Sequence, residues 1–378
     1  MPWKLLCVGG ARPNFMKLAP LCAVLRDDPL VGLVLVHTGQ HYDDALSGCF
    51  FRELGLPEPT HYLHAGSASH AQQTAEIMRR FEPVLIAEAP AAVVVVGDVN
   101  STMACALVAV KLQVPVVHVE AGLRSFDRSM PEEINRRVTD AVADLLLVTE
   151  ASGRRNLLAE GIPEESIRMV GNLMVDTLRQ NLESARREDT LRRIGVEAGT
   201  YGVVTLHRPA NVDDRGTLAE ILGALEQISR EMTLLWPVHP RTRPQLADAL
   251  GDNTRLRLLA PLGYRDFLNL MAHCAAVFTD SGGVQEETTA LGVPCLTLRN
   301  NTERPVTIEE GTNLLGGTQK STILAAWEQM RLHPKAGRIP AYWDGKAAGR
   351  CRQALLEFLD RRRRATESAG LSPAGGTA

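Results

Sequence analysis

The stretch LLCVGGARPNFMKLAP, residues 5–20, combines a short apolar run, two glycines and a segment of helical character. Leu5–Val8 has the length and apolar composition of a buried parallel strand. The glycines permit a tight turn after it, and Pro13 is suited to the first turn of a following helix. The stretch therefore predicts the strand–turn–helix unit of which doubly wound parallel sheets are built.

The same unit recurs along the 378 residues of the chain. Further strands are predicted at Leu33–His37, Val93–Val96, Val116–Val119, Leu145–Val148, Val203–Leu206, Leu234–Val238, Leu256–Leu259, Val277–Thr279 and Cys295–Leu298. Helical segments such as Ser101–Lys111 lie between them. The alternation predicts an α/β protein with doubly wound parallel sheets. Because the chain is too long for one ordinary core, we expect two Rossmann-like domains.

The pattern of strands also predicts the domain boundaries. Asp176–Arg193 has the composition of a charged connecting helix, so residues 1–170 are expected to form the N-terminal domain and residues 171–348 the C-terminal one. A helix at about 349–360 is expected to pack back on the first domain. Residues 361–378 hold four arginines and then a Ser/Gly/Pro/Ala-rich tail, which predicts a solvated helix end and disorder rather than a lipid or nucleic-acid anchor.

Composition and charge narrow the class of protein. Hydrophobic residues make up 45% and charged residues 22%, as in globular proteins, and the net charge of −3 argues against non-specific nucleic-acid binding. No apolar run approaches the length of a membrane span. Met1–Gly10 is typical of a first strand rather than a signal peptide. The seven cysteines have no CxxC or zinc-like spacing and are expected to be reduced thiols, so we expect a cytoplasmic protein without a membrane partner.

Polar residues and glycines follow almost every predicted strand. In open α/β sheets the ligand binds beyond the carboxyl ends of the strands, so these positions are the first candidates for a site. They are Gly9–Arg12, Thr38–His41, Gly97–Asp98, Glu120–Gly122, Thr149–Glu150, His207–Arg208, His239–Pro240 and Asp280–Gly283. Two such domains facing each other would enclose a cleft lined by acids, histidines and arginines.

The segment DSGGVQEE, residues 280–287, has the features of a phosphate-binding helix start. Ser281 is suited to cap a helix, and Gly282 and Gly283 let a ligand approach the free backbone N–H groups. The partial positive charge of a helix N-terminus favours a phosphate there. Glu287 follows about one and a half turns later, where its carboxylate suits a ribose diol. An ordinary helix start is the alternative interpretation.

A second cationic site is predicted after the first strand. Arg12 and Lys17 are about one and a half helical turns apart, so both suit a diphosphate. A surface Arg/Lys pair is the alternative interpretation. The segment lacks the G-x-G-x-x-G fingerprint, and no acid follows the strand Leu33–His37, which weighs against NAD.

The candidate acids and bases are Asp98, Glu120, Glu132 and His207. Asp98 and Glu120 each end a largely apolar strand, and His207 also lies at a strand end. Glu132 lies in the first turn of a helix, where a partner of the helix dipole is the alternative interpretation. His118 lies within a strand and is interpreted as a core histidine with satisfied hydrogen bonds. No His, Asp or Glu cluster has metal-ligand spacing, so no bound metal is predicted.

Taken together, the motifs resemble those of the non-hydrolysing UDP-N-acetylglucosamine 2-epimerases over roughly residues 4–355. They are, in order, Gly10–Pro20, Thr38–His41, Gly97–Ser101, His118–Arg124, Pro131–Arg136, Thr205–Arg208, Pro237–Pro240, Asp280–Glu287 and Thr302–Pro305. Each motif is weak alone, but their shared order is highly specific.

The resemblance implies a glycosyltransferase-B-like fold, an isomerase of polysaccharide biosynthesis and usually a homodimer. It implies reversible interconversion of UDP-N-acetylglucosamine and UDP-N-acetylmannosamine without a cofactor. The reaction eliminates UDP, leaves a glycal and adds UDP back. A hydrolysing epimerase, which releases free N-acetylmannosamine, and a retaining glycosyltransferase of the same fold remain alternatives. A non-catalytic nucleotide-sugar sensor is a third.

The resemblance also implies roles for single residues. Asp98, Glu120, Glu132 and His207 correspond to the catalytic residues. The implied substrate contacts are Arg12, Lys17, Arg136, His239, Ser281, Gly282, Gly283 and Glu287, with Phe267 near the uracil. Gln40 and His41 correspond to a regulatory site for a second substrate molecule. Many bacterial relatives have Arg-Glu-Met after this Gln-His pair, whereas Tyr42-Asp43-Asp44 follows here, which leaves open whether that regulation is present.

Overall fold

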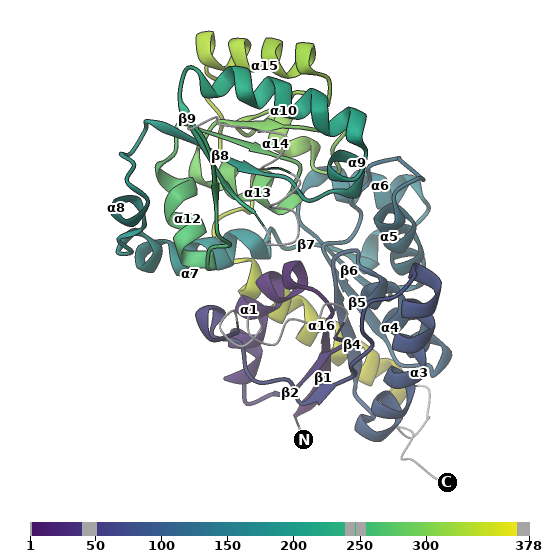
Figure 1. Cartoon of the computed structure of the whole chain (residues 1–378). Coiled ribbons are helices and arrows are strands. Elements are labelled where there is room, and N and C mark those ends of the chain that lie inside the picture. The colour runs from purple at the N-terminus through teal and green to yellow at the C-terminus, as the bar shows by residue number, and fades with distance from the viewer. Residues whose placement is uncertain (1, 40–50, 239–245, 247–254, 369–378) are drawn as a thin grey trace. The chain divides into compact units, whose positions relative to one another are not determined.

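The strands of the strand–turn–helix units form two separate parallel sheets (Figure 1). The computed structural model describes residues 2–39, 51–238, 246 and 255–368. The chain divides into unit 1, which comprises Met1–Thr177 and Asp344–Ala378, and unit 2, Leu178–Trp343. The chain passes between the units at 177/178 and 343/344, several residues from the expected positions 170/171 and 348/349.

Unit 1 contains a sheet of seven parallel strands in the order β3-β2-β1-β4-β5-β6-β7. The strands are β1 (Trp3–Gly9), β2 (Val31–His37), β3 (His61–Tyr62), β4 (Ala92–Val96), β5 (Val116–Val119), β6 (Leu145–Val148) and β7 (Ile167–Met169). The helices of this part of the chain are α1 (Arg12–Arg26), α3 (His70–Glu88), α4 (Asn100–Lys111), α5 (Pro131–Val142), α6 (Ala151–Ala159), the 3-10 helix Glu164–Ser166 and α16 (Ala347–Ser368).

Helices cover both faces of this sheet. α1 and α16 pack together on one face, and α3, α4 and α5 lie on the other (Figure 1). Alternate residues of the strands therefore enter two different cores. Leu6 and Val95 pack with Phe81 of α3, while Leu5 and Cys7 are buried on the opposite side. Burial on both faces explains why these strands appear in the sequence as continuous apolar runs.

Unit 2 contains six parallel strands in the order β10-β9-β8-β11-β12-β13. The strands are β8 (Tyr201–Thr205), β9 (Thr233–Pro237), β10 (Leu256–Leu259), β11 (Ala276–Thr279), β12 (Cys295–Thr297) and β13 (Asn313–Leu315). The helices are α7 (Leu173–Arg186), which contains the unit boundary, α8 (Thr190–Ile194), α9 (Pro209–Val212), α10 (Arg215–Ser229), α12 (Tyr264–His273), α13 (Gly282–Leu291), α14 (Pro305–Glu309) and α15 (Lys320–Leu332).

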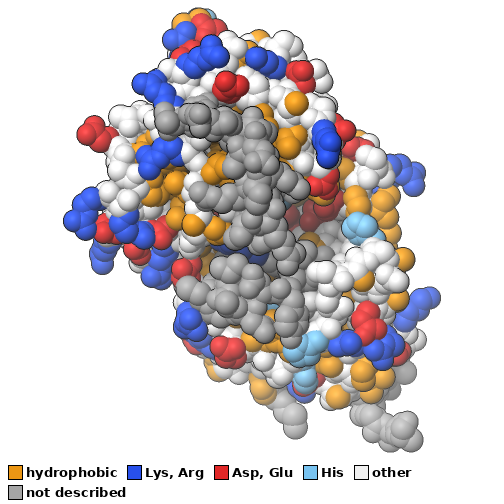
Figure 2. Space-filling view, viewed as in Figure 1, with side chains coloured by type: hydrophobic (Ala, Val, Ile, Leu, Met, Phe, Trp, Pro, Cys, Tyr) orange, Lys and Arg blue, Asp and Glu red, His pale blue; other side chains and the backbone are white. Residues whose placement is uncertain are grey.

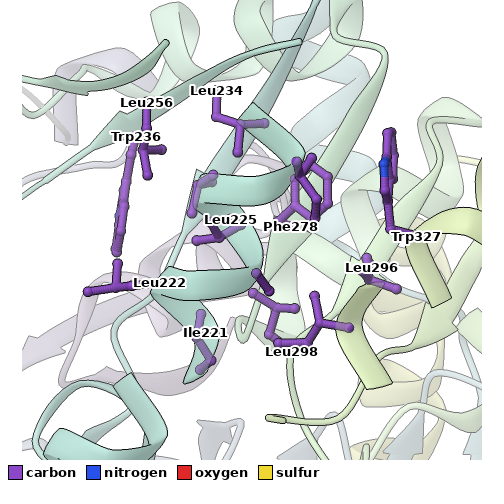
Figure 3. Packing of buried hydrophobic residues seen from close by; sticks show 14 of the residues in the cluster. Ile221, Leu222, Leu225, Leu234, Trp236, Leu256, Phe278, Leu296, Leu298 and Trp327 are labelled. Atoms are coloured by element: carbon purple, nitrogen blue, oxygen red, sulfur yellow. The ribbon is translucent and has the colours of Figure 1, made fainter. Parts of the chain in front are cut away.

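The core of unit 2 lies under α10 and α15 (Figure 3). Ile221 and Leu225 of α10 point toward the sheet, and Phe278 of β11 packs against Trp327 of α15 with ring centroids 5.4 Å apart. The other face is covered by α12 and α13 (Figure 1). This packing fixes the strand ends from which the candidate residues project.

Each sheet has a point where the direction of strand addition reverses. In unit 1 it lies between β1 and β4, and in unit 2 between β8 and β11. Helices leave neighbouring strands on opposite faces at such a point, so a crevice for a ligand opens at the carboxyl ends. The turns after these strands contain Gly10, Asp98, His207 and Asp280.

The predicted fold class, two doubly wound parallel α/β sheets, is confirmed. Sequence reasoning missed β3, β7 and β13, which have two or three residues each. The single helix predicted over Asp176–Arg193 was wrong, since α7 ends at Arg186 and α8 is a separate short helix. The start of α7 is packed into unit 1, because Asp176 is buried and accepts hydrogen bonds from the first amides of α16, those of Ala347 and Ala348.

The C-terminal helix is longer than predicted. α16 continues to Ser368, so the expectation of disorder from residue 361 was wrong for residues 361–368, while 369–378 lie outside the described residues. Arg362 pairs with Asp144 at 3.3 Å. The guanidinium of Arg363 lies 5.3 Å from the ring centroid of Trp3. These contacts hold part of the arginine run against unit 1.

The surface carries charges of both signs. On the face shown in Figure 2, blue and red side chains are interspersed over the coloured residues, as the small net charge suggests. Within the described ranges, no helix is both long and apolar enough to cross a membrane.

Candidate active site

In unit 1, Asn14 ties the turn after β1 to the end of β4. Its Oδ1 accepts hydrogen bonds from the amides of Gly10 and Ala11, both at 3.1 Å, and its Nδ2 donates to Val96 O at 2.8 Å. A Cβ on Gly10 would lie 2.7 Å from Ser101 Cβ, so only glycine fits. The two strand ends at the reversal point are thereby held together.

The two cations predicted to bind a diphosphate have different environments. Arg12 is exposed at the start of α1. Lys17, further along the helix, is buried and forms an ion pair with Glu120 at the end of β5. The backbone of Glu120 has φ of 70°, a conformation that non-glycine residues rarely adopt and that recurs at functional sites. The structure thus joins a predicted substrate contact and a predicted catalytic acid in one ion pair.

Asp98, at the end of β4, is held by Arg136 of α5. The Nη2 and Nε of Arg136 donate to Asp98 Oδ2 at 2.7 and 3.0 Å. Arg136 Nη1 donates to Glu133 Oε2 at 2.8 Å. Arg136 is buried, whereas 22% of the Asp98 side chain is exposed. The guanidinium that the resemblance places on the nucleotide therefore orients a carboxylate of its own unit here.

The neighbouring acids of α5 have different surroundings. Glu133 is fully buried and accepts hydrogen bonds from the amide and hydroxyl of Ser125 at 2.8 and 3.0 Å and from the amide of Phe126 at 3.3 Å. Glu132 is half-buried in the first turn of the helix. Glu133 thus has the structural role, which leaves Glu132 as the candidate for chemistry.

In unit 2, the reversal point brings His207 and Asp280 together. The imidazole Nδ1 of His207 lies 3.0 Å from Asp280 Oδ1. The amides of His207 and Arg208 donate to the same carboxylate at 3.0 to 3.2 Å, and Asn211 Nδ2 donates at 3.2 Å. Burial disfavours the charge of Asp280, but these partners outweigh it and hold its pKa below the usual value.

The imidazole of His207 is held by Asp280 through Nδ1, while the rest of its ring is largely exposed. Asp280 is fully buried, whereas 62% of the His207 side chain is exposed. Because Nδ1 faces the carboxylate, Nε2 is the nitrogen available to a ligand. Sequence reasoning placed Asp280 at a helix start but gave it no role beside His207. The rule that selected Asp98, an acid within two residues of the end of an apolar strand, also selects Asp280, which directly follows β11.

The start of α13 is packed against a buried charge cluster. Arg304 donates to Glu286 Oε1 and Glu303 Oε1, both at 2.6 Å. A Cβ on Gly282 would lie 2.7 Å from Arg304 Cζ. The packing of this buried guanidinium therefore leaves little room for a side chain at Gly282. Sequence reasoning missed the cluster, although it recognised Thr302–Pro305 as a motif.

The amides at this helix start are suited to an anion. The Ser281 amide donates to Thr279 Oγ1 at 3.0 Å, which fixes the turn into the helix. The first turn of α13 has no acid of its own, and it begins with Gly282 and Gly283. Ser281 is the N-cap residue of α13 but its side chain makes no capping hydrogen bond, and phosphate binding at this helix start stays a prediction.

The two remaining predicted contacts of unit 2 lie on α13 and α12. Glu287 is buried and accepts a 2.8 Å hydrogen bond from the hydroxyl of Tyr264. Phe267 lies about one turn after Tyr264 on α12 and is half-buried. Tyr264 thus orients the carboxylate that was predicted to bind a ribose.

Three predicted residues, Gln40, His41 and His239, lie outside the described residues. Among the described residues, no group of three His, Cys, Asp or Glu side chains is placed to hold a metal ion. His118 has the predicted core environment, with both ring nitrogens in hydrogen bonds. The cysteines that the structure describes are free thiols, and most are buried.

Known proteins share this fold and sequence over most of their length. A UDP-N-acetylglucosamine 2-epimerase of Methanocaldococcus jannaschii is 41% identical over 357 residues, which are 92% of this chain and 97% of that protein. A crystal structure of the M. jannaschii UDP-GlcNAc 2-epimerase in complex with UDP-GlcNAc and UDP matches with a TM-score of 0.87 at 40% identity, covering 94% of this chain and 99% of that chain.

Two further matches show the breadth of the similarity. A UDP-2,3-diacetamido-2,3-dideoxy-D-glucuronate 2-epimerase of Pseudomonas aeruginosa is 38% identical over 324 residues, 85% of this chain and 90% of that protein. A UDP-glucosyltransferase of Polygonum tinctorium matches with a TM-score of 0.61 at 16% identity, over 99% of this chain and 96% of that chain, and so shows the glycosyltransferase-B-like fold alone.

The family model described as UDP-N-acetylglucosamine 2-epimerase matches residues 23–356. This range contains strand ends of both units at which candidate residues lie. The chain therefore belongs to the UDP-N-acetylglucosamine 2-epimerase family.

Proposed function

We propose that this enzyme interconverts UDP-N-acetylglucosamine and UDP-N-acetylmannosamine by elimination and re-addition of UDP. The observation that carries the proposal is the near full-length similarity to the M. jannaschii epimerase, whose crystal structure holds UDP-GlcNAc and UDP. The paired acids and cations at the strand ends support it, because the reaction needs both.

The chemistry determines which groups are required. The C2 proton of the sugar is not acidic, since no carbonyl group adjoins C2. Departure of UDP breaks the C1–O bond and develops positive charge at C1, so that a base can take the C2 proton as the C1–C2 double bond forms. UDP oxygen then adds back to C1, and an acid returns a proton to the opposite face of C2. At least two acid–base groups and a cationic contact for the leaving diphosphate are needed.

The proposed acid–base groups are Asp98, Glu120, Glu132 and His207. Asp98 and Glu120 end the neighbouring strands β4 and β5, and each forms an ion pair with a cation, Asp98 with Arg136 and Glu120 with Lys17. We propose that His207 acts through its open Nε2. Asp98, Glu120 and Glu132 belong to unit 1, and His207 belongs to unit 2.

The proposed nucleotide contacts combine cations with backbone amides. The N-terminus of α13 is suited to an anion because its first turn carries no acid. Glu287 would accept hydrogen bonds from the ribose, and Phe267 would contact the uracil. The groups proposed to bind the diphosphate are Arg12, Lys17, Arg136, His239, Ser281 and the amides of Gly282 and Gly283.

Isotope exchange tests the proposal. In heavy water, NMR should show deuterium at C2 of UDP-N-acetylglucosamine and of its epimer, with no free sugar. Asp98→Asn should slow the exchange by about 10²- to 10⁴-fold. Absence of exchange by the folded enzyme would reject the epimerase. Free N-acetylmannosamine appearing in step with UDP would indicate a hydrolysing enzyme, and turnover only with an added acceptor would indicate a glycosyltransferase.

A second substrate is favoured by one relative. The P. aeruginosa enzyme, 38% identical, is a UDP-2,3-diacetamido-2,3-dideoxy-D-glucuronate 2-epimerase. The same exchange experiment, run with this nucleotide sugar and with UDP-N-acetylglucosamine, compares the rates at which deuterium enters C2 of the two sugars. Faster exchange into the diacetamido sugar would reassign the substrate but retain elimination at C2.

We also propose that the enzyme is a cytoplasmic homodimer. The free, buried thiols of the described cysteines suit a reducing compartment, and the family resemblance implies a homodimer. Light scattering on a sizing column should give about twice the chain mass of 41.2 kDa. A monomer mass would reject the dimer, and recovery outside the cytoplasm on cell fractionation would reject the compartment.

A further inference from the structure

A buried histidine and aspartate link the two strand ends that carry the acids of unit 1. His118, within β5, is fully buried. Its Nδ1 lies 2.6 Å from Asp140 Oδ1, and its Nε2 lies 2.8 Å from the carbonyl oxygen of Gly97. Because a carbonyl oxygen only accepts hydrogen bonds, Nε2 donates to Gly97, while Nδ1 faces the carboxylate of Asp140. His118 thus bridges α5 to the turn after β4.

Asp140 extends the connection to the turn after β5. Its Oδ2 accepts from the Gly122 amide at 3.1 Å and pairs with Arg124 Nη1 at 2.7 Å. Arg124 in turn donates to the exposed Glu160 at 2.9 and 2.6 Å, so the buried guanidinium lies between two carboxylates. Burial disfavours the charge of Asp140, but His118 and Arg124 outweigh it and hold its pKa below the usual value.

The backbone groups held in this way belong to turns with unusual backbone conformations. Gly97 has φ of 70° and Gly122 φ of 81°, and between them Glu120 has φ of 70°. A Cβ on Gly122 would lie 2.8 Å from the carbonyl carbon of Gly153, so the turn has no room to relax. Glycine adopts a positive φ readily, but the conformation of Glu120 is strained and persists only where the surroundings fix it. Gly97 directly precedes Asp98, and Gly122 follows Glu120 by two residues.

We propose that His118 and Asp140 are positioning residues for the reaction, holding the carboxylates of Asp98 and Glu120 in place through the backbone of their turns. The proposal rests on the proposed function. Neither residue needs to contact the substrate. Loss of the Gly97 hydrogen bond would let the Asp98 turn relax, and a misplacement of about 1 Å costs an enzyme about 10²-fold in rate.

Two variants of His118 separate the two hydrogen bonds. The side-chain amide of glutamine reaches the position of imidazole Nε2 and can donate to Gly97, whereas asparagine reaches only the position of Nδ1, which faces Asp140. We expect His118→Asn to lower kcat about 10²-fold with KM changed less than about 3-fold. His118→Gln should retain kcat within about 10-fold. His61→Gln, which removes a histidine–carboxylate pair with Glu88 elsewhere in unit 1, should leave both constants unchanged.

Hydrogen exchange of the backbone provides a measurement independent of catalysis. Mass spectrometry should show faster exchange around residues 97–98 in folded His118→Asn than in the wild type, and around 120–122 in Asp140→Asn. The Asp140 variant also serves as the test if His118→Asn does not fold. Unchanged kcat and exchange in a folded variant, or equal losses in both His118 variants, would overturn the proposal. A wild-type enzyme without C2 exchange would instead contradict the proposed function, while the backbone measurement would still test the positioning.

Discussion

At the residue scale, the carboxylate of Asp280 holds both the side chain and the backbone of the candidate catalytic residue His207. It binds the side chain of His207, the amides of His207 and Arg208 and the side chain of Asn211. A histidine used as an acid or base needs one nitrogen fixed so that the other faces the substrate. The single buried carboxylate supplies this orientation and also shapes the loop after β8.

We predict that Asp280→Asn lowers kcat about 10²-fold while KM stays nearly constant. The amide is close in size to the carboxylate but removes the negative charge opposite His207 Nδ1, so the ring loses its preferred orientation. Asp214→Asn is the matched control, because Asp214 caps α10 in the same unit by accepting from the Thr217 amide at 2.7 Å. Steady-state kinetics of the two variants give the comparison. An Asp280→Asn enzyme with normal kcat would show that His207 does not depend on this partner.

At the element scale, the central strands were predictable and the short edge strands were not. β1, β4, β5 and β6 lie between two layers of helices, and burial on both faces produces an apolar run that the sequence reveals. β3 and β13 lie at sheet edges and are too short to show a periodic pattern. The break between α7 and α8 was missed because both segments are rich in charge, and tertiary contacts decide where each helix ends.

The start of α13 offers a test of packing around a helical glycine. Because a Cβ on Gly282 would lie 2.7 Å from Arg304 Cζ, Gly282→Ala must displace a buried guanidinium that holds Glu286 and Glu303. We predict a loss of about 1–3 kcal/mol in the free energy of unfolding. Gly349→Ala in α16 is the control, since nothing lies within 4 Å of its added Cβ, and it should be neutral or stabilising by up to about 1 kcal/mol.

Urea unfolding of the two alanine variants measures this difference. Equal stability would mean that Arg304 moves aside without cost, and the glycine would then be explained by ligand approach alone. Nucleotide binding by Gly282→Ala, measured by calorimetry with UDP under conditions where the variant is folded, separates the two roles.

At the scale of the whole molecule, sequence reasoning located the candidate residues but not their partners. Strand ends in a parallel sheet can be counted from the sequence, so Asp98, Glu120 and His207 were found by position. Lys17 pairs with Glu120 from a distant strand–helix unit, which no local pattern records. Arg136 was expected at the nucleotide from the resemblance, whereas the described contacts join it to Asp98. Which side chains form ion pairs depends on how the elements pack in the folded protein, and local sequence patterns do not predict that packing.

The pH dependence of stability also belongs to the whole molecule, because unfolding of unit 1 exposes the buried His37. This imidazole stacks on Tyr62 at a centroid distance of 4.2 Å and accepts a 2.8 Å hydrogen bond from the Gly39 amide at Nδ1. Burial, and then the nearby His64, lower the pKa of His37 from 6.5 to about 4. Well above pH 6.5 the His37 imidazole is neutral in both the folded and the unfolded chain. Folding therefore releases no proton from it in that range.

As the pH falls below 6.5, the unfolded chain binds a proton that the folded chain resists until about pH 4, so stability is lost across this window. Between pH 7 and pH 5 the loss should be about 2 kcal/mol. We therefore predict that His37→Gln, although less stable than the wild type at pH 7, loses about 2 kcal/mol less between these two values in urea unfolding. His333→Gln, at an exposed histidine, should follow the wild type. Parallel pH dependence of His37→Gln and the wild type would show that His37 titrates normally in the folded enzyme.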